Sequence, residues 1–176
     1  MNIYLIGYRC TGKTAVGRCL ADLLEMAFVD ADRLFEQQTG MHIADYVSRY
    51  GWASFRDMEA GILLDLSQQQ DLVIATGGGV VLREKNVAQM RDSGIVAWLT
   101  AQPDTILARM QNDANSPHQR PSFTSNPLAD EVHQTLAQRN PLYENACHIR
   151  ISTDDADIEQ VCQTLREKIR SRYGWK

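Results

Sequence analysis

Eight residues near the N-terminus match the pattern of a phosphate-binding loop. Gly7, Gly12, Lys13 and Thr14 fit Gly-x4-Gly-Lys-[Ser/Thr]. Phosphate groups are bound by backbone N–H donors, and glycines keep side chains from blocking the approach. Lys13 would place a positive charge at the β- and γ-phosphates of a nucleotide, and the Thr14 hydroxyl would bind Mg²⁺. A glycine-rich turn without a ligand is the alternative, but an apolar strand before the pattern and an amphipathic helix after it favour the phosphate loop.

Cys10 and Arg9 are two residues of this loop whose side chains are not explained by the glycine pattern. Cys10 stands where small-molecule kinases commonly have glycine. A side chain is accommodated there if the backbone φ is negative and the Cβ atom points away from the phosphates. Arg9 has the charge to contact a phosphate, but loop arginines are mostly exposed, so we expect it to be solvated.

Two acidic residues follow the second apolar run of the chain. Asp30 and Asp32 are separated by one alanine, directly after Ala27–Val29. Phosphoryl transfer uses one acidic residue to support the Mg²⁺ shell and another to align or deprotonate the attacking hydroxyl. Aspartate is also common at the start of helices, so Asp32 is alternatively the N-cap of the next helix. Spacing alone leaves both roles open.

A triple glycine and a helical Arg–Glu pair form the next candidate site. Gly77, Gly78 and Gly79 follow the third apolar run, where backbone N–H groups can reach a ligand, although a tight turn would use the same residues. Arg56 and Glu59 are three residues apart and share one face of a predicted helix. The pair is either a surface ion pair of little value or a carboxylate-binding arginine held in place by Glu59.

Two further arginines lie in the second half of the chain. Arg120 precedes a proline in a long polar segment, and Arg139 begins the motif Arg-x-Pro-Leu-Tyr. A single loop arginine usually faces solvent. If the polar segment folds over ATP, Arg120 would instead stabilise charge that develops in the transition state. The four histidines have no metal-binding spacing and are assigned no role.

Apolar runs predict the strands that must position these residues. There are five of them: Ile3–Ile6, Ala27–Val29, Leu72–Ala75, Ile95–Leu99 and the weaker Cys147–Ile151. Amphipathic segments lie between them, with helical spacing over Lys13–Leu24 and in a stripe from Ile158 to Ile169. This alternation predicts a doubly wound, three-layer α/β/α fold around a five-stranded parallel sheet. Ligands bind such sheets at the carboxyl ends of the strands, where the phosphate loop, the acid pair and the glycines are expected.

Two segments interrupt this alternation. Residues about 32–66 hold two or three helical pieces and form a helical insert. Residues about 111–127 are polar and rich in turn formers, which predicts a mobile lid. A length of 176 residues without an internal repeat predicts a single domain over residues 1–176.

Composition argues against several classes of protein. The net charge is −4, from 18 Lys and Arg against 22 Asp and Glu, whereas nucleic-acid-binding proteins are usually basic. No apolar stretch approaches about 20 residues and the N-terminus lacks the basic start of a signal peptide, so we expect neither a membrane span nor export. The four cysteines form no CxxC pair and are expected to be reduced thiols, which indicates the cytoplasm. We expect a monomer.

The ordered set of motifs resembles shikimate kinase over nearly the whole chain. The set comprises Gly-x4-Gly-Lys-Thr, Asp-x-Asp, Phe-Arg-x-x-Glu, Gly-Gly-Gly, Arg-Pro and Arg-x-Pro-Leu-Tyr. This resemblance implies a P-loop kinase fold whose helical insert binds the substrate. It also implies transfer of the ATP γ-phosphate to the 3-hydroxyl of shikimate, with Mg²⁺ as cofactor, in chorismate and aromatic amino-acid biosynthesis.

The same resemblance implies a role for each matching residue. Asp32 would deprotonate the attacking hydroxyl and Asp30 would support the metal through water. The implied catalytic residues are Lys13, Asp32 and Arg120, and the metal residues are Thr14 and Asp30. The implied substrate contacts are Asp32, Arg56, Gly77, Gly78, Gly79 and Arg139. The implied ATP contacts are Cys10, Thr11, Gly12, Lys13, Thr14, Ala15, Arg109 (against the adenine) and Arg120.

Four departures from the family pattern bear on these roles. Glycine is more common than cysteine at position 10, and Ser or Thr is more common than alanine at position 15. The segment from Arg109 to Arg120 is several residues longer than in many members. The loop at Thr153 gives no clear adenine contact, and none is assigned there.

Two other functions remain open at this point. One is a gluconate-type kinase of the same architecture; Arg56 and Arg139 together with the glycines favour shikimate. The other is a catalytically silent nucleotide-binding regulatory module, which the unusual Cys10 would favour. A silent module need not keep all of the residues that phosphoryl transfer uses, so their presence argues against it; they are Lys13, Thr14, Asp32 and Arg120.

Overall fold

Five short strands form one parallel sheet in the computed structural model, which describes residues 1–112 and 128–174. The strands are β1 (Asn2–Ile6), β2 (Ala27–Asp30), β3 (Leu72–Ala75), β4 (Gly94–Thr100) and β5 (Ile149–Ser152). Their order in the sheet is β2-β3-β1-β4-β5, and every neighbouring pair is parallel. The predicted strands and their parallel arrangement are therefore confirmed, with bounds that differ by at most two residues.

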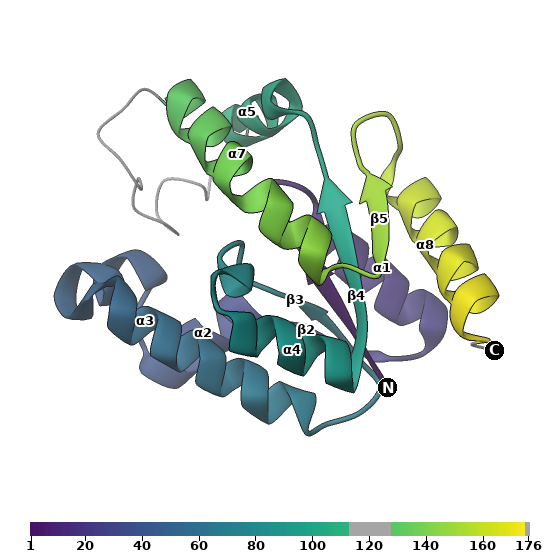
Figure 1. Ribbon diagram of the computed structural model, residues 1–176, viewed down its shortest axis with the longest axis horizontal. Coiled ribbons are helices and arrows are strands. Elements are labelled where there is room, and N and C mark those ends of the chain that lie inside the picture. The colour runs from purple at the N-terminus through teal and green to yellow at the C-terminus, as the bar shows by residue number, and fades with distance from the viewer. Residues whose placement is uncertain (113–127, 175–176) are drawn as a thin grey trace.

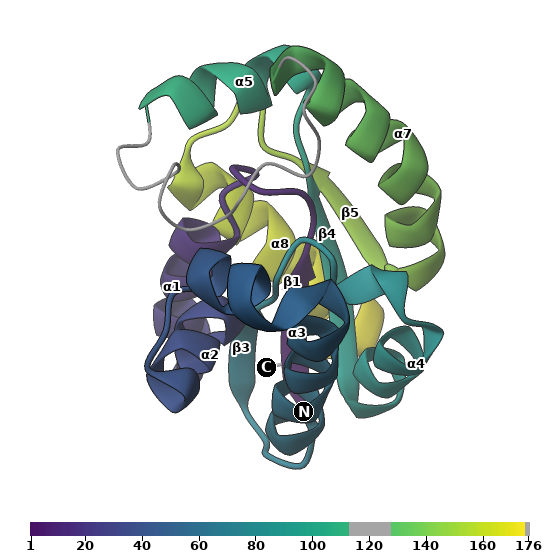
Figure 2. The same ribbon diagram turned by 90° about the vertical axis from the view of Figure 1, so that its left-hand side faces the viewer.

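Helices cover both faces of this sheet (Figure 1). They are α1 (Lys13–Leu24), α2 (Ala31–Thr39), α3 (Ile43–Ser67), α4 (Glu84–Ser93), α5 (Pro103–Asn112), α7 (Leu128–Ala146) and α8 (Ile158–Tyr173), with a 3₁₀ turn at Val80–Leu82. The cores show that α1 and α8 pack on one face, while α3, α4 and α7 pack on the other. Figure 2 shows the same layers from the side. The predicted three-layer α/β/α class is correct.

Strand β1 shows why the strands are continuously apolar. Tyr4 and Ile6 belong to the core under α3, α4 and α7, whereas Ile3 and Leu5 belong to the core under α1 and α8. All four side chains are fully buried. Successive strand residues point to opposite faces, and here both faces are covered by helices, so no position is left for a polar side chain facing water.

The predicted helical insert consists of α2 and α3. Helix α2 ends at Gly40, whose φ of 67° is a left-handed conformation typical of a helix C-terminus. Helix α3 contains a break at Gly51, where φ is 82° and ψ is 164°. The expectation of two or three helical pieces is met by α2 and the two parts of α3.

Asn2 fixes the far end of α3 to the sheet. Its side chain is fully buried at the start of β1. The amide nitrogen donates to the carbonyls of Leu66 and Gln69, and the amide oxygen accepts from the N–H of Leu72. These bonds join the end of α3 to the start of β3, so the insert has a defined position relative to the strand that leads into the glycines.

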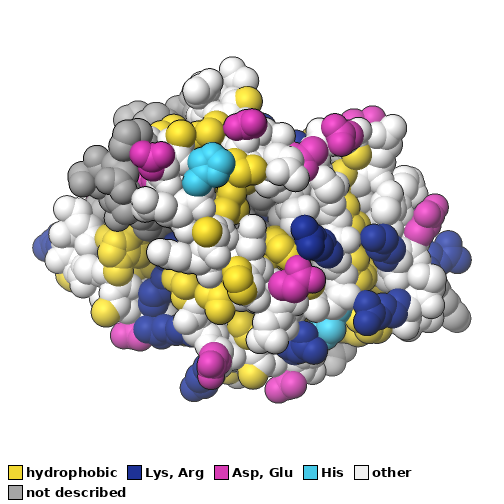
Figure 3. All heavy atoms as spheres, turned by 45° about the horizontal axis from the view of Figure 1, so that its top comes forward, with side chains coloured by type: hydrophobic (Ala, Val, Ile, Leu, Met, Phe, Trp, Pro, Cys, Tyr) yellow, Lys and Arg dark blue, Asp and Glu magenta, His cyan; other side chains and the backbone are white. Residues whose placement is uncertain are grey.

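The predicted lid lies almost wholly outside the described residues. Of residues 111–127, only Gln111 and Asn112 are described, and they end α5. In the part of the chain that the structure covers, no helix is long and apolar enough to cross a membrane. On the face shown in Figure 3, acidic and basic side chains are both present, and several basic side chains gather toward the right of the view.

Candidate active site

The phosphate loop joins the central strand β1 to helix α1. Gly12 has a φ of 90° and occupies the N-cap of α1 without a side-chain cap hydrogen bond. The first N–H groups of this 12-residue helix, together with its dipole, are therefore directed toward an anion at the loop. Lys13 Nζ donates to the carbonyls of Gly7 (2.9 Å) and Tyr8 (2.8 Å). The loop thus holds the lysine ammonium against its own backbone carbonyls, and the predicted role of Lys13 at the nucleotide phosphates stays a prediction.

Cys10 differs from the sequence-based expectation. Its φ is +61°, in the left-handed region, and not negative. This conformation suits glycine and costs an ordinary L-residue about 1–2 kcal/mol. It explains why glycine is common at this position, and it means that the loop accommodates Cys10 with backbone strain.

Arg9 is not the solvated arginine that we expected. Its side chain is 12% exposed, and Nη2 lies 2.8 Å from Oε1 of Glu131, whose side chain is 1% exposed. Glu131 lies in the first turn of α7. The expectation was wrong because the partner lies 122 residues away in the chain, and a buried ion pair of this kind draws the phosphate loop and α7 together.

Arg109 lies where the phosphate loop meets the segment after β5. Its Nη1 donates to the carbonyl of Cys10 (3.2 Å) and to the hydroxyl of Thr153 (3.0 Å), and Nη2 donates to the carbonyl of Thr153. The structure therefore places Arg109 beside the loop, although its predicted contact with adenine stays a prediction.

Thr14 and Asp30 form the candidate metal site. Thr14 Oγ1 donates to Asp30 Oδ2 at 2.7 Å. Hydroxyl and carboxylate oxygens are the ligand types that Mg²⁺ prefers, and Mg²⁺ at nucleotide sites takes most of its remaining ligands from phosphate and water. The described residues contain no cluster of three or more His, Cys, Asp or Glu that could hold a metal. This pair fits a metal that arrives with the nucleotide.

Asp30, and not Asp32, caps helix α2. The N-cap of α2 is Asp30, whose Oδ1 accepts from the backbone N–H of Asp32 (3.1 Å) and of Arg33 (3.3 Å). Asp32 is therefore not the cap. It lies in the first turn of α2, and a Cβ atom added to Gly77 would meet its Oδ1 at 2.9 Å. The cap holds Asp32 beside the glycine turn.

Arg56 and Glu59 form a buried ion pair against this turn. Arg56 Nη1 lies 2.7 Å from Glu59 Oε2, and the side chains are 13% and 7% exposed. A Cβ atom on Gly79 would lie 2.1 Å from Arg56 Nη2, and one on Gly77 would lie 2.6 Å from Glu59 Oε1. Only residues without a side chain permit this approach. The surface-pair alternative is wrong.

Arg139 and Tyr143 hold the same turn from α7. Arg139 Nη1 donates to the carbonyl of Gly78 at 3.2 Å, and the Tyr143 hydroxyl donates to the same oxygen. Both side chains are buried, and the Tyr143 ring stacks on Trp98 with centroids 5.6 Å apart. The structure thus brings Arg56 and Arg139 to one glycine turn, and their predicted role in binding a carboxylate stays a prediction.

The sequence analysis missed two functional contacts. It gave no role to Glu131, and it quoted Tyr143 only as part of a motif. Tyr143 was recognisable, because it lies four residues after Arg139 and so shares a helix face with it. Glu131 had no local signal. Arg120, predicted to be catalytic, lies outside the described residues.

Burial perturbs the carboxyl group of Glu59. Removal from water raises its pKa above the ordinary value of 4.5, against the opposing charges of Arg56, Arg139 and Arg83. Its Oε1 has no hydrogen-bond partner among the described residues. The Glu59 carboxyl group is therefore paired with the Arg56 guanidinium through Oε2. Its other oxygen, Oε1, can accept a hydrogen bond from a further donor.

Comparison of the sequence with known proteins identifies the family of this chain. A family model described as shikimate kinase matches residues 9–170. The chain belongs to the shikimate kinase family. Two relatives are the shikimate kinase of Symbiobacterium thermophilum, 39% identical over 98% of both chains, and shikimate kinase 2 of Pectobacterium atrosepticum, 39% identical over 93% of this chain and 95% of that protein. As a member of this family the chain is an ATP-dependent kinase, and such kinases use ATP with a divalent metal ion.

Some solved structures are similar to this chain in both sequence and fold, and others are similar in fold alone. The shikimate kinase from Acinetobacter baumannii in complex with shikimate is 34% identical, with a TM-score of 0.90 over 98% of this chain and 94% of that chain. A gluconokinase from Sinorhizobium meliloti covers 98% of this chain and 97% of its own, but at 14% identity and a TM-score of 0.53. The second likeness shows a common fold alone.

The raised pKa of Glu59 predicts a pH-dependent stability. The folded protein keeps the Glu59 proton to higher pH than the unfolded chain, so between the two pKa values it binds more protons and loses stability as pH rises. The Glu59→Gln variant has no carboxyl group at this position, so it lacks this pH-dependent contribution to the free energy of unfolding. We expect the free energy of unfolding of the wild type to fall relative to Glu59→Gln as pH rises from about 4.5 toward 8, measured by urea denaturation of the protein without ligands.

Glu167→Gln, on the exposed side of α8, controls for the loss of one carboxylate. A difference between wild type and Glu59→Gln that stays constant with pH, or that grows in favour of the wild type, would contradict the raised pKa.

Proposed function

We propose that the chain transfers the γ-phosphate of ATP to the 3-hydroxyl of shikimate, giving 3-phosphoshikimate and ADP in aromatic amino-acid biosynthesis. The observation that carries this proposal is the glycine turn. Arg56 and Arg139 both contact it and Asp32 lies against it, at the same edge of the sheet as the phosphate loop. An acceptor with one carboxylate and neighbouring hydroxyls matches two arginines beside one aspartate.

On the donor side, residues Cys10 to Ala15 wrap the ATP phosphates and Lys13 carries the positive charge toward the transferred group. Thr14 and Asp30 are the residues that would hold Mg²⁺, with Thr14 as a ligand and Asp30 in a supporting role. Bound Mg²⁺ would neutralise charge on the β- and γ-phosphates. The 2.7 Å hydrogen bond between Thr14 and Asp30 supports this assignment, since it brings hydroxyl and carboxylate to one place.

On the acceptor side, Arg56 and Arg139 bind the shikimate carboxylate, and the backbone of Gly77 to Gly79 contacts the ring substituents. Asp32 accepts the proton of the attacking 3-hydroxyl. The hydroxyl oxygen forms the new bond to the γ-phosphorus as the bond from that phosphorus to ADP breaks. Removal of that proton makes the oxygen a better nucleophile, and a positioned carboxylate is suited to the task. The ion pair with Glu59 keeps the Arg56 guanidinium in one orientation.

Two arginines complete the proposed site. Arg120, outside the described residues, reaches the ATP phosphates and stabilises charge in the transition state. Arg109 packs against the adenine. Its three hydrogen bonds to Cys10 and Thr153 support this role, because they fix the guanidinium beside the phosphate loop.

We also propose that residues 1–176 form one domain that acts as a cytoplasmic monomer. Support for the cytoplasm comes from Cys10, Cys19, Cys147 and Cys162, which are all free thiols.

The central test is ADP release by the purified protein with Mg²⁺ and ATP, in the presence of shikimate or of gluconate. Shikimate should give turnover well above the rate with ATP alone, and gluconate should not, because the two buried arginines suit a carboxylate on a ring held against the glycine turn. Turnover with gluconate alone would favour the gluconate-type kinase, and binding of ATP and shikimate without turnover would favour the silent module.

Substitution of Arg56 should separate the two substrates. Hydrogen bonds to a charged partner contribute about 1.5–3 kcal/mol, so Arg56→Ala should raise KM for shikimate about 10- to 150-fold while KM for ATP stays nearly unchanged. Because this change also leaves Glu59 without its cation, Arg56→Lys is measured as well; it keeps the charge but loses the bidentate geometry.

Two further variants sharpen this measurement. Arg83→Ala removes an arginine from a more exposed ion pair with Asp57 and should leave both KM values unchanged. Asp32→Asn, at the same glycine turn as Arg56, should instead lower kcat by about 10²- to 10⁴-fold. Equal losses of affinity for ATP and shikimate in Arg56→Ala would contradict the proposed division of roles.

A further inference from the structure

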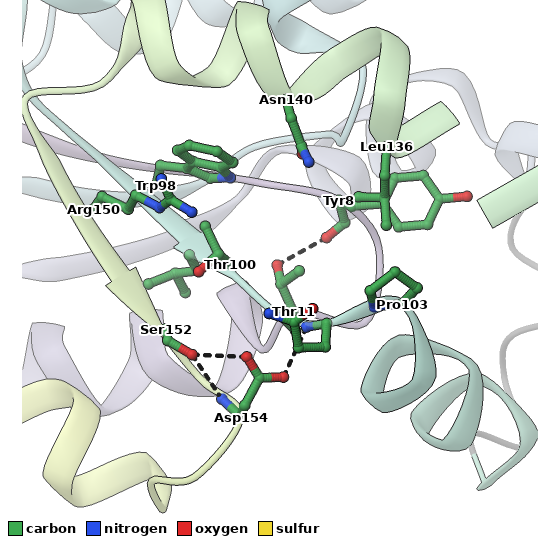
Figure 4. Close-up of a pocket in the computed structure, with 13 residues that line it drawn as sticks. Tyr8, Thr11, Trp98, Thr100, Pro103, Leu136, Asn140, Arg150, Ser152 and Asp154 are labelled. Carbon is green, nitrogen blue, oxygen red and sulfur yellow. Dashed lines mark hydrogen bonds between the residues drawn. The ribbon is translucent and has the colours of Figure 1, made fainter. Parts of the chain in front are cut away.

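A separate cavity of about 560 Å³ lies between α7, the start of α5 and the ends of β4 and β5. Figure 4 shows the residues that line it. None of them belongs to the pocket at the glycine turn. Its volume is in the range of sites that bind small molecules. Thr11, which belongs to the segment proposed to wrap the ATP phosphates, also lines the cavity. The cavity is therefore separate from the proposed shikimate position, and it borders the phosphate loop.

Hydrogen-bond donors from three elements converge on this cavity. They come from Trp98 on β4, Asn140 on α7 and Arg150 on β5. The Trp98 side chain is almost wholly buried, but its indole nitrogen is not among the buried side-chain atoms that lack a hydrogen-bond partner. The indole N–H is therefore open to the cavity, where an acceptor on a ligand can reach it.

Arg150 adds a positive charge at the same end. Its guanidinium carbon lies 4.7 Å from the centroid of the Trp98 ring. One guanidinium nitrogen also lies 3.2 Å from Glu144, but both side chains of that pair are more than half exposed, so the pair is weak. A guanidinium has five N–H donors and matches a carboxylate with two of them.

The opposite end of the cavity is negative. Burial would raise the pKa of Asp154, but hydrogen bonds from the Gln102 N–H and the Ser152 hydroxyl outweigh it and lower that pKa. Asp154 is thus a carboxylate at neutral pH and repels an anion. A negatively charged ligand would place its charge at Trp98, Asn140 and Arg150, and not at Asp154.

Apolar surfaces line the space between the two ends. Tyr8, Leu136 and Pro103 contribute side chains from the phosphate loop, α7 and α5. Such walls favour a flat, apolar ligand body. Tyr8 also has a carbonyl that accepts from Lys13 Nζ and from the Thr11 hydroxyl. An occupant would therefore pack against a residue that helps to hold the phosphate-loop lysine.

We propose that this cavity is a binding site for a small aromatic carboxylate, separate from the position of shikimate and bordered by Thr11 of the phosphate loop. The carboxylate accepts hydrogen bonds from the Trp98 indole, the Asn140 amide and the Arg150 guanidinium. The ring packs between Leu136, Tyr8 and Pro103.

Indole N–H signals in ¹H–¹⁵N NMR spectra test this proposal with benzoate as the probe. The chain has three tryptophans, Trp52, Trp98 and Trp175, and the variants Trp52→Phe and Trp175→Phe assign the three signals while leaving Trp98 in place. Excess shikimate is present, because benzoate could otherwise bind Arg56 and Arg139. We expect a saturable shift of the Trp98 signal with a dissociation constant on the order of 1 mM, and a much weaker effect of the neutral analogue benzamide.

Arg150→Gln should weaken benzoate binding about fivefold or more, because it removes the only full positive charge at this end of the cavity among the described residues that line it. Arg18→Gln is the matched control: Arg18 also lies over an aromatic ring, that of Phe28, but does not line the cavity. The proposal is overturned if the Trp98 signal does not shift, if only the Trp52 signal shifts, or if Arg150→Gln and Arg18→Gln bind benzoate equally well.

Discussion

The ion pair of Arg56 and Glu59 against the glycine turn is the contact on which the acceptor side of this site depends. Two charged groups are removed from water there, and such burial is costly unless the charges are paired in good geometry. The pair is 2.7 Å apart, and the rings of Trp52 and Phe55 lie 5.4 and 5.0 Å from the guanidinium. The pair also requires glycine at positions 77 and 79. A Cβ atom on Gly77 would occupy the space of the Glu59 side chain, and one on Gly79 would occupy that of Arg56. A guanidinium is thereby fixed at a buried position where an anionic substrate can reach it.

The rest of the site follows from where that turn lies. It begins at the end of β3, which pairs with β1, the strand that leads into the phosphate loop. Asp30 caps α2 and so holds Asp32 against Gly77. From the other side, Arg139 and Tyr143 bind the Gly78 carbonyl, and α7 is tied to the loop itself through Glu131 and Arg9. Donor and acceptor positions are thus joined by one helix and two neighbouring strands.

The sequence predicted those parts of the molecule that depend on local pattern. The strands, helix α1 and the insert follow from apolar periodicity, and the phosphate loop follows from glycine spacing. The sequence did not predict features that depend on distant contacts or on backbone geometry. Arg9 was expected in solvent because its partner Glu131 is far away in the chain, and the left-handed φ of Cys10 is invisible in a residue type that seldom adopts it. The helix cap was considered for Asp32, whereas Asp30 both caps α2 and bonds Thr14.

Adding a single methyl group to the glycine turn tests the role of Arg56 most directly. Gly79→Ala places a Cβ atom where the Arg56 guanidinium lies, whereas Gly61→Ala, in α3, adds one that meets nothing within 4 Å. Steady-state kinetics with shikimate and ATP, on variants shown to be folded, should give a KM for shikimate raised about tenfold or more in Gly79→Ala, with KM for ATP unchanged and Gly61→Ala like the wild type. A KM for shikimate in Gly79→Ala equal to that of the wild type would contradict the claim that Arg56, seated on the glycine turn, binds the acceptor.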